Sequence, residues 1–174
     1  MRAVDVRIDG FRVERAPEWR GQRVFVRHEV GGKAYELRLS EESAGTQKLM
    51  GLAAYLMTAL ERGGTVVVDE LDAKLHPKLL RYVILLFKDP GVNKSGAQLI
   101  FSSQDVSTMR NDVFRRDEIW FAARGEGEAS QLWSLADIHE ANGNLVSKNA
   151  AFDKQYLSGR YGADPYLTRI EEWD

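Results

Sequence analysis

The chain has 174 residues, and its 24 Lys and Arg against 26 Asp and Glu give a formal net charge of −2, which argues against a polybasic nucleic-acid or membrane module. The hydrophobic fraction of 44% is enough for a folded core, and the length is that of one ordinary domain. The absence of cysteine excludes disulfide scaffolds, thiolate zinc sites and cysteine nucleophiles. Because no apolar segment approaches the roughly 20 residues of a membrane span and no signal-peptide core opens the chain, we expect a soluble, cytoplasmic protein with no membrane partner.

The first forty residues predict a small antiparallel sheet. Apolar and charged side chains alternate in residues 4–8, 23–30 and 33–39, which is the period of half-buried strands. Gly31 and Gly32 separate the last two of these segments and predict a tight hairpin between them.

The pattern then changes to that of an α/β fold. Residues 43–62 carry apolar side chains at helical spacing, with Ser43 as the N-cap and Gly63 as the stop. Residues 65–68 (TVVV) are continuously apolar, which predicts a parallel strand buried on both faces. Pro77 marks the first turn of a second helix, and residues 98–102 form the next strand.

Two further strands are expected near the end of the chain, at residues 118–123 and 131–135, joined by a turn at residues 125–127. Trp120 and Trp133 should pack in the core across this hairpin. The order of elements predicts an α/β fold in which a mostly parallel sheet has flanking helices and a small antiparallel sheet precedes it.

Two consecutive carboxylates, Asp69 and Glu70, follow the apolar run, and Asp72 comes two residues later. In open α/β sheets, ligands bind beyond the carboxyl ends of the strands. One acid placed there can hold a hard cation through oxygen, and the other can orient or deprotonate a water. The alternative is that the acids only mark a strand end and a turn; we favour the functional interpretation.

The string VVVDELD resembles the Walker B strand and D-loop of ABC-type P-loop ATPases. This resemblance implies that Asp69 belongs to the magnesium shell, that Glu70 is the general base, and that Asp72 is the acid of the D-loop.

Upstream, LSEESAGTQKL resembles the signature segment of bacterial ATPases related to the RecF and SMC heads. A serine cap and a glycine leave backbone N–H groups free at a helix N-terminus, which suits an anion. The resemblance implies that this segment faces the γ-phosphate of a nucleotide held by the other subunit of a dimer, through Ser43, Gly45, Thr46 and Gln47.

Downstream, QLIFSSQD resembles the strand that ends in the switch motif of this family, where Gln104 stands in place of the usual histidine. A glutamine amide can position a water but cannot shuttle a proton as imidazole does. Gln104 is therefore either a catalytic residue of an altered or sensing site, or only a polar cap on a strand end.

The resemblance covers nearly the whole chain, including residues 115–135 and 156–165, and points to bacterial AAA-family ATP-binding proteins of abortive-infection and phage-defence systems. It implies ATP and Mg²⁺ as cofactors. It also implies one domain, with an antiparallel part at residues 1–39, an α/β part at 40–150 and a tail at 151–174.

The sequence contains no Walker A loop of the form G-x-x-x-x-G-K-[ST]; the nearest string, at residues 91–96, lacks its ending. Because the family carries this loop near its N-terminus, we expect the chain to correspond to the C-terminal portion of an ATPase head. The partner would be a second copy of the chain, or a segment or polypeptide that carries Walker A.

Two other functions stay open. The chain could be a non-catalytic regulatory or interaction module that retains the ATPase fold, which the missing loop and Gln104 favour. More weakly, it could be a metal-dependent nuclease in which four carboxylates hold two cations: Asp69, Glu70, Asp72 and Asp105. A basic cluster makes nucleic acid a further candidate partner: Arg110, Arg115 and Arg116.

Overall fold

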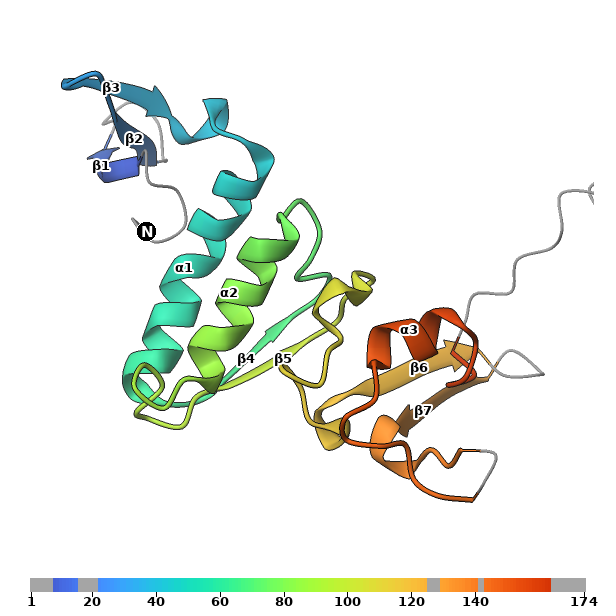
Figure 1. The fold of residues 1–174 in the computed structure, drawn as a ribbon. Coiled ribbons are helices and arrows are strands. Elements are labelled where there is room, and N and C mark those ends of the chain that lie inside the picture. The colour runs from blue at the N-terminus through green and yellow to red at the C-terminus, as the bar shows by residue number, and fades with distance from the viewer. Residues whose placement is uncertain (1–7, 16–21, 125–128, 141–142, 164–174) are drawn as a thin grey trace, which may run out of the picture. The chain divides into compact units, whose positions relative to one another are not determined.

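The computed structural model describes residues 8–15, 22–124, 129–140 and 143–163 (Figure 1). The chain divides into two units, residues 1–104 and 105–174. None of the helices in these described ranges is long and apolar enough to cross a membrane.

The first unit begins with the predicted antiparallel sheet, in the order β1 (Ile8–Arg15), β2 (Gln22–Val30) and β3 (Lys33–Arg38). Gly31 and Gly32 form the turn between β2 and β3 with φ values of 59° and 76°, which glycine adopts without steric cost. The part of the predicted first strand before residue 8 lies outside the described residues.

Helix α1 (Ala44–Arg62) is confirmed together with both of its predicted ends. The Ser43 hydroxyl accepts a hydrogen bond from the Thr46 N–H at 3.1 Å, which is the N-cap geometry. At the other end Gly63, with φ of 81°, donates its N–H to Ala59 O at 2.8 Å.

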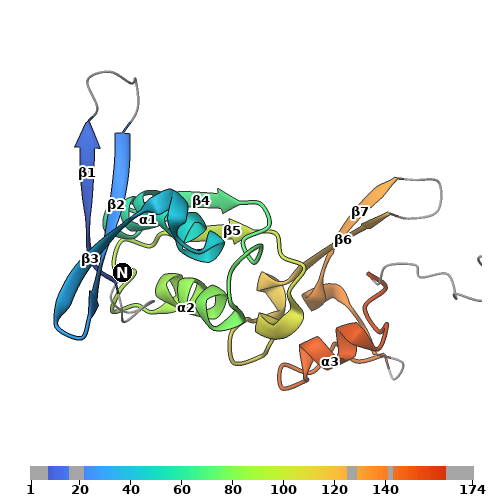
Figure 2. The same cartoon turned by 90° about the horizontal axis from the view of Figure 1, so that it is seen from above.

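The parallel pair of the first unit consists of β4 (Thr65–Val68) and β5 (Gln98–Phe101). Helix α2 (Pro77–Lys88) connects them; it begins at the N-cap His76 with Pro77 in its first turn, as predicted. Helix α1 contacts β4 and α2 contacts β5, so the two helices cover the face of the sheet to which Val68 points (Figures 1 and 2).

The prediction that residues 65–68 are buried on both faces is wrong in the described structure. Val67 and its register partner Ile100 point to the face that the helices do not cover, and they are 72% and 56% exposed. A continuous apolar run is typical of a parallel strand with both faces covered, but within the first unit the described helices cover only one face.

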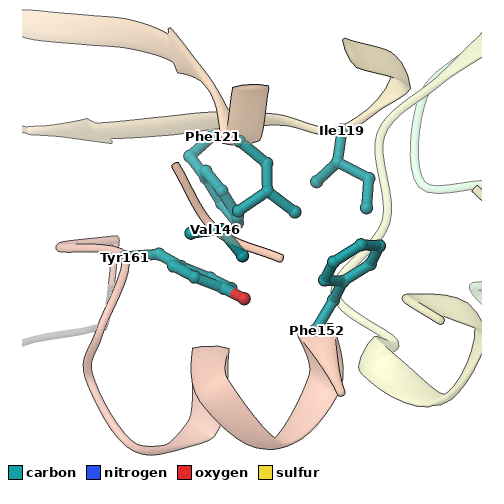
Figure 3. Packing of buried hydrophobic residues seen from close by; sticks show 6 residues of the cluster. Ile119, Phe121, Val146, Phe152 and Tyr161 are labelled. Atoms are coloured by element: carbon teal, nitrogen blue, oxygen red, sulfur yellow. The ribbon is translucent and has the colours of Figure 1, made fainter. Parts of the chain in front are cut away.

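The second unit contains a hairpin of β6 (Trp120–Arg124) and β7 (Ser130–Ser134), followed by the short helix α3 (Phe152–Leu157). Figure 3 shows part of its core, with Phe121 and Tyr161 among the labelled side chains. The centroid of the Phe121 ring lies 5.3 Å from that of Tyr161 and 5.8 Å from that of Tyr156. Six buried residues make up this core: Ile119, Phe121, Leu135, Val146, Phe152 and Tyr161.

The mixed α/β class is confirmed, but the expected mostly parallel sheet is not. The first unit contains one parallel pair and one antiparallel sheet, and in the second unit β6 pairs antiparallel with β7. A parallel return needs a crossover, usually a helix, whereas the segment between β5 and β6 holds only the 3₁₀ turns Val106–Thr108 and Arg116–Glu118.

The prediction that both tryptophans pack in the core is wrong for one of them. Phe121 and Trp133 are paired across the hairpin and face the core, whereas Trp120, one residue earlier, points outward and is 58% exposed. Its indole N–H donates to Asp117 O at 3.2 Å. The predicted turn at residues 125–127 lies outside the described residues.

Candidate functional site

The carboxylates that follow β4 are held by the residue that follows β5. Ser102 donates its N–H to Val68 O at 3.1 Å and accepts the Leu71 N–H at 3.0 Å through its carbonyl. Its hydroxyl donates to Asp69 Oδ1 and accepts the Glu70 N–H at 2.7 Å. Ser102 therefore fixes the start of the acidic loop, residues 69–76, through both its backbone and its side chain.

Glu70 adopts a left-handed backbone conformation, with φ of 48°, and its side chain is exposed. Its carbonyl accepts two hydrogen bonds, from the Ala73 N–H at 3.0 Å and from Lys48 Nζ at 2.5 Å. The left-handed region costs a non-glycine residue roughly 1 kcal/mol or more, so these bonds hold Glu70 where its intrinsic preference would not.

The far end of the acidic loop approaches the first turn of α1. A Cβ added to Gly45 would lie 2.8 Å from Lys74 O, closer than real Cβ atoms come. Lys74 is also left-handed, with φ of 65°. Gly45 and Lys48 are three residues apart and share one face of the helix, so this face contacts the acidic loop at two points.

The N-terminus of α1 is capped as the sequence predicts, and anion binding at this helix start stays a prediction. Of the four N–H groups that an α-helix leaves unbonded at its start, that of Thr46 is capped by Ser43, and those of Ala44 and Gly45 are outside the helix's own hydrogen bonds. The Ser43 and Thr46 hydroxyls lie 2.9 Å apart. One of these hydroxyls donates to the other, so two backbone amides and one hydroxyl proton gather within one turn, which are donors that a phosphate could accept.

The Gln47 side chain bonds to the protein backbone and is not directed at the predicted anion site by any described contact. Its side-chain amide donates to Glu42 O at 2.8 Å and so holds the chain that enters the helix. The Glu42 carboxylate in turn lies 2.6 Å from His28 Nε2 of β2, and both side chains are largely buried. The start of α1 is thereby connected to the antiparallel sheet.

Asp72 and Gln104 meet at the carboxyl ends of the two parallel strands. The Gln104 N–H donates to Asp72 Oδ2 at 3.3 Å, while Oδ1 is buried with no hydrogen-bond partner among the described residues. An unpaired buried oxygen is costly, so a donor from a ligand or a neighbouring chain would be favourable at this atom.

The donor set at Asp69 suits a magnesium ion. Its exposed carboxylate lies at a strand end among oxygen groups, with Ser102 Oγ bonded to one of its oxygens. Mg²⁺ takes one or two protein carboxylates and completes its shell with waters and phosphates, so one such acid is enough. Within the described ranges, no group of three or more His, Asp or Glu side chains is arranged to hold a metal, which leaves the two-cation nuclease without a cluster.

The basic cluster of the second unit is engaged within that unit. Arg110 pairs with Asp112 at 3.1 Å and Arg115 with Asp117 at 2.8 Å. Arg116 donates to Val146 O. The two ion pairs neutralise part of the positive charge, so this cluster attracts the phosphates of a nucleic acid less strongly.

The structure thus brings together, within the first unit, the helix start at residues 43–48, the acidic loop and the end of β5. Sequence reasoning missed the two residues that connect them, Lys48 and Ser102. The available signal was positional: Lys48 directly follows Gln47, the last residue predicted to face the γ-phosphate, and Ser102 is the first polar residue after the neighbouring strand.

Comparisons with known proteins place this mixed α/β unit in a class of ATPase domains. A family model described as "AAA domain, putative AbiEii toxin, Type IV TA system" matches residues 3–110, which is more than half of the chain. The chain belongs to this AAA domain family.

Among solved structures, the chain is similar to one described as "Structural biochemistry of ATP-driven dimerization and DNA stimulated activation of SMC ATPases". The two are 17% identical, 72% of each chain is covered, and the TM-score is 0.50, which shows a shared fold. The curated proteins contain no match to the chain.

Proposed function

We propose that this chain forms one part of a composite ATP site, to which it supplies the helix start at residues 43–47, the carboxylates Asp69 and Glu70, and the acidic loop. The Walker A loop would come from another segment or polypeptide, and the helix start would face a nucleotide held by a second subunit. The similar SMC ATPase structure is described as one of ATP-driven dimerization, and this is the behaviour we transfer to the chain.

The single observation that carries the proposal is the convergence of three segments that are distant in sequence. Ser102 from the end of β5 bonds to Asp69 and Glu70, and Lys48 from α1 bonds to Glu70. A strand end marked by acids for structural reasons alone would not need a left-handed glutamate held from both sides.

Each group would have one task. Asp69 would hold Mg²⁺, which when bound neutralises phosphate charge, and Glu70 would accept the proton of the attacking water. The free N–H groups of Ala44 and Gly45, with the hydroxyls of Ser43 and Thr46, would receive the γ-phosphate oxygens. Catalysis in P-loop enzymes rests mainly on such positioning and charge stabilisation.

The test is MgATP binding and dimer formation, measured by calorimetry and light scattering. The chain should be measured alone and co-expressed with the coding sequence directly upstream, as a source of the phosphate loop. We expect binding and dimerization in at least one of these forms. Absence of binding in both forms would refute the proposal.

Turnover then tests the base. Glu70→Gln should keep MgATP binding and dimerization but stop hydrolysis, because the amide cannot take up the proton of water. Glu61→Gln, which removes an exposed acid near the other end of α1, is the matched control and should hydrolyse ATP at the wild-type rate. An unchanged rate in Glu70→Gln would remove Glu70 from this role.

A regulatory module is the second candidate, because Gln104 stands where the resemblance implies the switch histidine and the 174 residues contain no Walker A loop. Binding and dimerization without turnover in the wild type would favour it. Metal-dependent DNA or RNA cleavage without ATP, lost in Glu70→Gln, would instead favour the nuclease.

A further inference from the structure

We propose that Lys48 is a positioning residue that couples the anion site at the start of α1 to the carboxylate of Glu70. The inference rests on the proposed function, because it assigns a regulating contact to the same composite site. Through this contact, a nucleotide bound at the start of α1 would change the position of the Glu70 carboxylate.

The first step is that Lys48 holds the backbone of Glu70. Lys48 Nζ donates to Glu70 O, and an ammonium donor makes this hydrogen bond charge-assisted. The Glu70 N–H is bound to Ser102 Oγ at 2.7 Å, so the peptide groups on both sides of its Cα are fixed. Because Glu70 is left-handed, loss of one bond lets its backbone relax and reorients its carboxylate.

The second step is that Lys48 moves with the anion site. Ser43 caps α1, and Lys48 lies in the next turn of the same helix, on the face of Gly45. A phosphate received at the N-terminus orders or shifts this turn, and a hydrogen-bonded helical turn transmits the change as one body. The close approach of Gly45 to Lys74 O carries the same change to the other end of the acidic loop.

The Lys48 side chain is held at the acidic loop and does not extend into water. A surface lysine normally extends into water, where its side chain keeps its rotamer freedom. Here the side chain is half-buried and directed at a main-chain carbonyl, so the role is geometric. Lys48 does not need to touch the reacting atoms and is not itself a catalytic residue.

The test compares three variants by hydrogen–deuterium exchange of residues 69–76. Lys48→Met keeps the length of the stem and removes the donor, Lys48→Arg keeps a cationic donor, and Lys94→Met removes a charge from an exposed loop. Without nucleotide, we expect the Glu70 amide to exchange about tenfold faster in Lys48→Met, since a hydrogen bond to a charged group is lost. Lys48→Arg should restore most of the protection, and Lys94→Met should match the wild type.

With MgATP, residues 69–76 of the wild type should gain protection, and Lys48→Met should lose that gain while still binding nucleotide. In the form that hydrolyses ATP, the kcat of Lys48→Met should fall about tenfold with little change in KM. If the wild type shows no response to MgATP, the proposed function fails. If the wild type responds and Lys48→Met responds equally, or if Glu70 exchange is unchanged in Lys48→Met without nucleotide, the Lys48 proposal is overturned.

Discussion

Gly45 and Gly51 lie in the same helix and provide a matched pair of substitutions. An alanine Cβ at Gly45 would meet Lys74 O at 2.8 Å, whereas at Gly51 it would meet nothing within 4 Å. At Gly51, in the helix interior, alanine gains roughly 0.5–1 kcal/mol of helix stability because it loses less backbone entropy than glycine, and at Gly45, in the first turn, the gain is no larger. Their difference therefore reports mainly the cost of the close approach.

At Gly45 the Lys74 carbonyl would have to retreat by several tenths of an ångström to reach ordinary van der Waals contact. Overpacking of this kind costs about 1–3 kcal/mol. We expect Gly51→Ala to stabilise the first unit and Gly45→Ala to be less stable than Gly51→Ala by about 2 kcal/mol. With a urea m-value of about 2 kcal/mol/M, the two midpoints should differ by about 1 M.

The assay is urea unfolding followed by the helical circular-dichroism signal. This signal reports mainly the first unit, because α1 and α2 have 19 and 12 residues and α3 has 6. Equal midpoints for the two variants would show that α1 does not approach the acidic loop at Gly45. That result would also remove one of the two contacts that connect the anion site to the acidic loop.

Three further predictions concern other parts of the molecule. Ser102→Ala should destabilise the first unit by about 1–2 kcal/mol in the same urea assay, since two side-chain hydrogen bonds are lost. Ser102→Thr keeps the hydroxyl and should recover most of the lost stability. An unchanged urea midpoint in Ser102→Ala would contradict the hydrogen bonds described for the acidic loop. Ser43→Arg should lose the N-cap, at about 1 kcal/mol, and abolish ATP-dependent dimerization in light scattering; unaltered dimerization would argue against a phosphate at this helix start. Burial raises the pKa of Tyr161 from 10.0 to about 12, so the folded second unit favours the protonated phenol: its stabilising contribution is complete below pH 10 and is lost as the pH rises through about 12. In an ultraviolet titration, Tyr161→Phe should remove the tyrosine ionisation that occurs at the highest pH. If the wild type shows no ionisation near pH 12, the burial of the Tyr161 phenol is contradicted.

Local rules account for the parts of the fold that the sequence predicted correctly. Ser43, Gly63 and Pro77 mark helix ends through their own hydrogen bonds and dihedral angles, and these interactions act over only a few residues. The Gly31–Gly32 hairpin follows for the same reason. Such features do not depend on what the rest of the chain does.

Predictions that depended on residues far away in the sequence were less successful. The environment of Val67 depends on whether a second layer covers the sheet, and the pairing of β6 depends on the segment that precedes it. The roles of Lys48 and Ser102 arise from contacts across 22 and 32 or more residues, which no local pattern encodes. The acids themselves were visible in the sequence, but the groups that orient them were not.

The uncovered face at Val67 and Ile100 has a consequence for how the protein is made. Short parallel strands pair late in folding, and β-branched side chains on a bare sheet face adhere to similar surfaces of other molecules. We therefore expect the yield of soluble chain to fall as its concentration rises during synthesis. A charged residue at position 67 should raise that yield, because it interrupts the apolar surface.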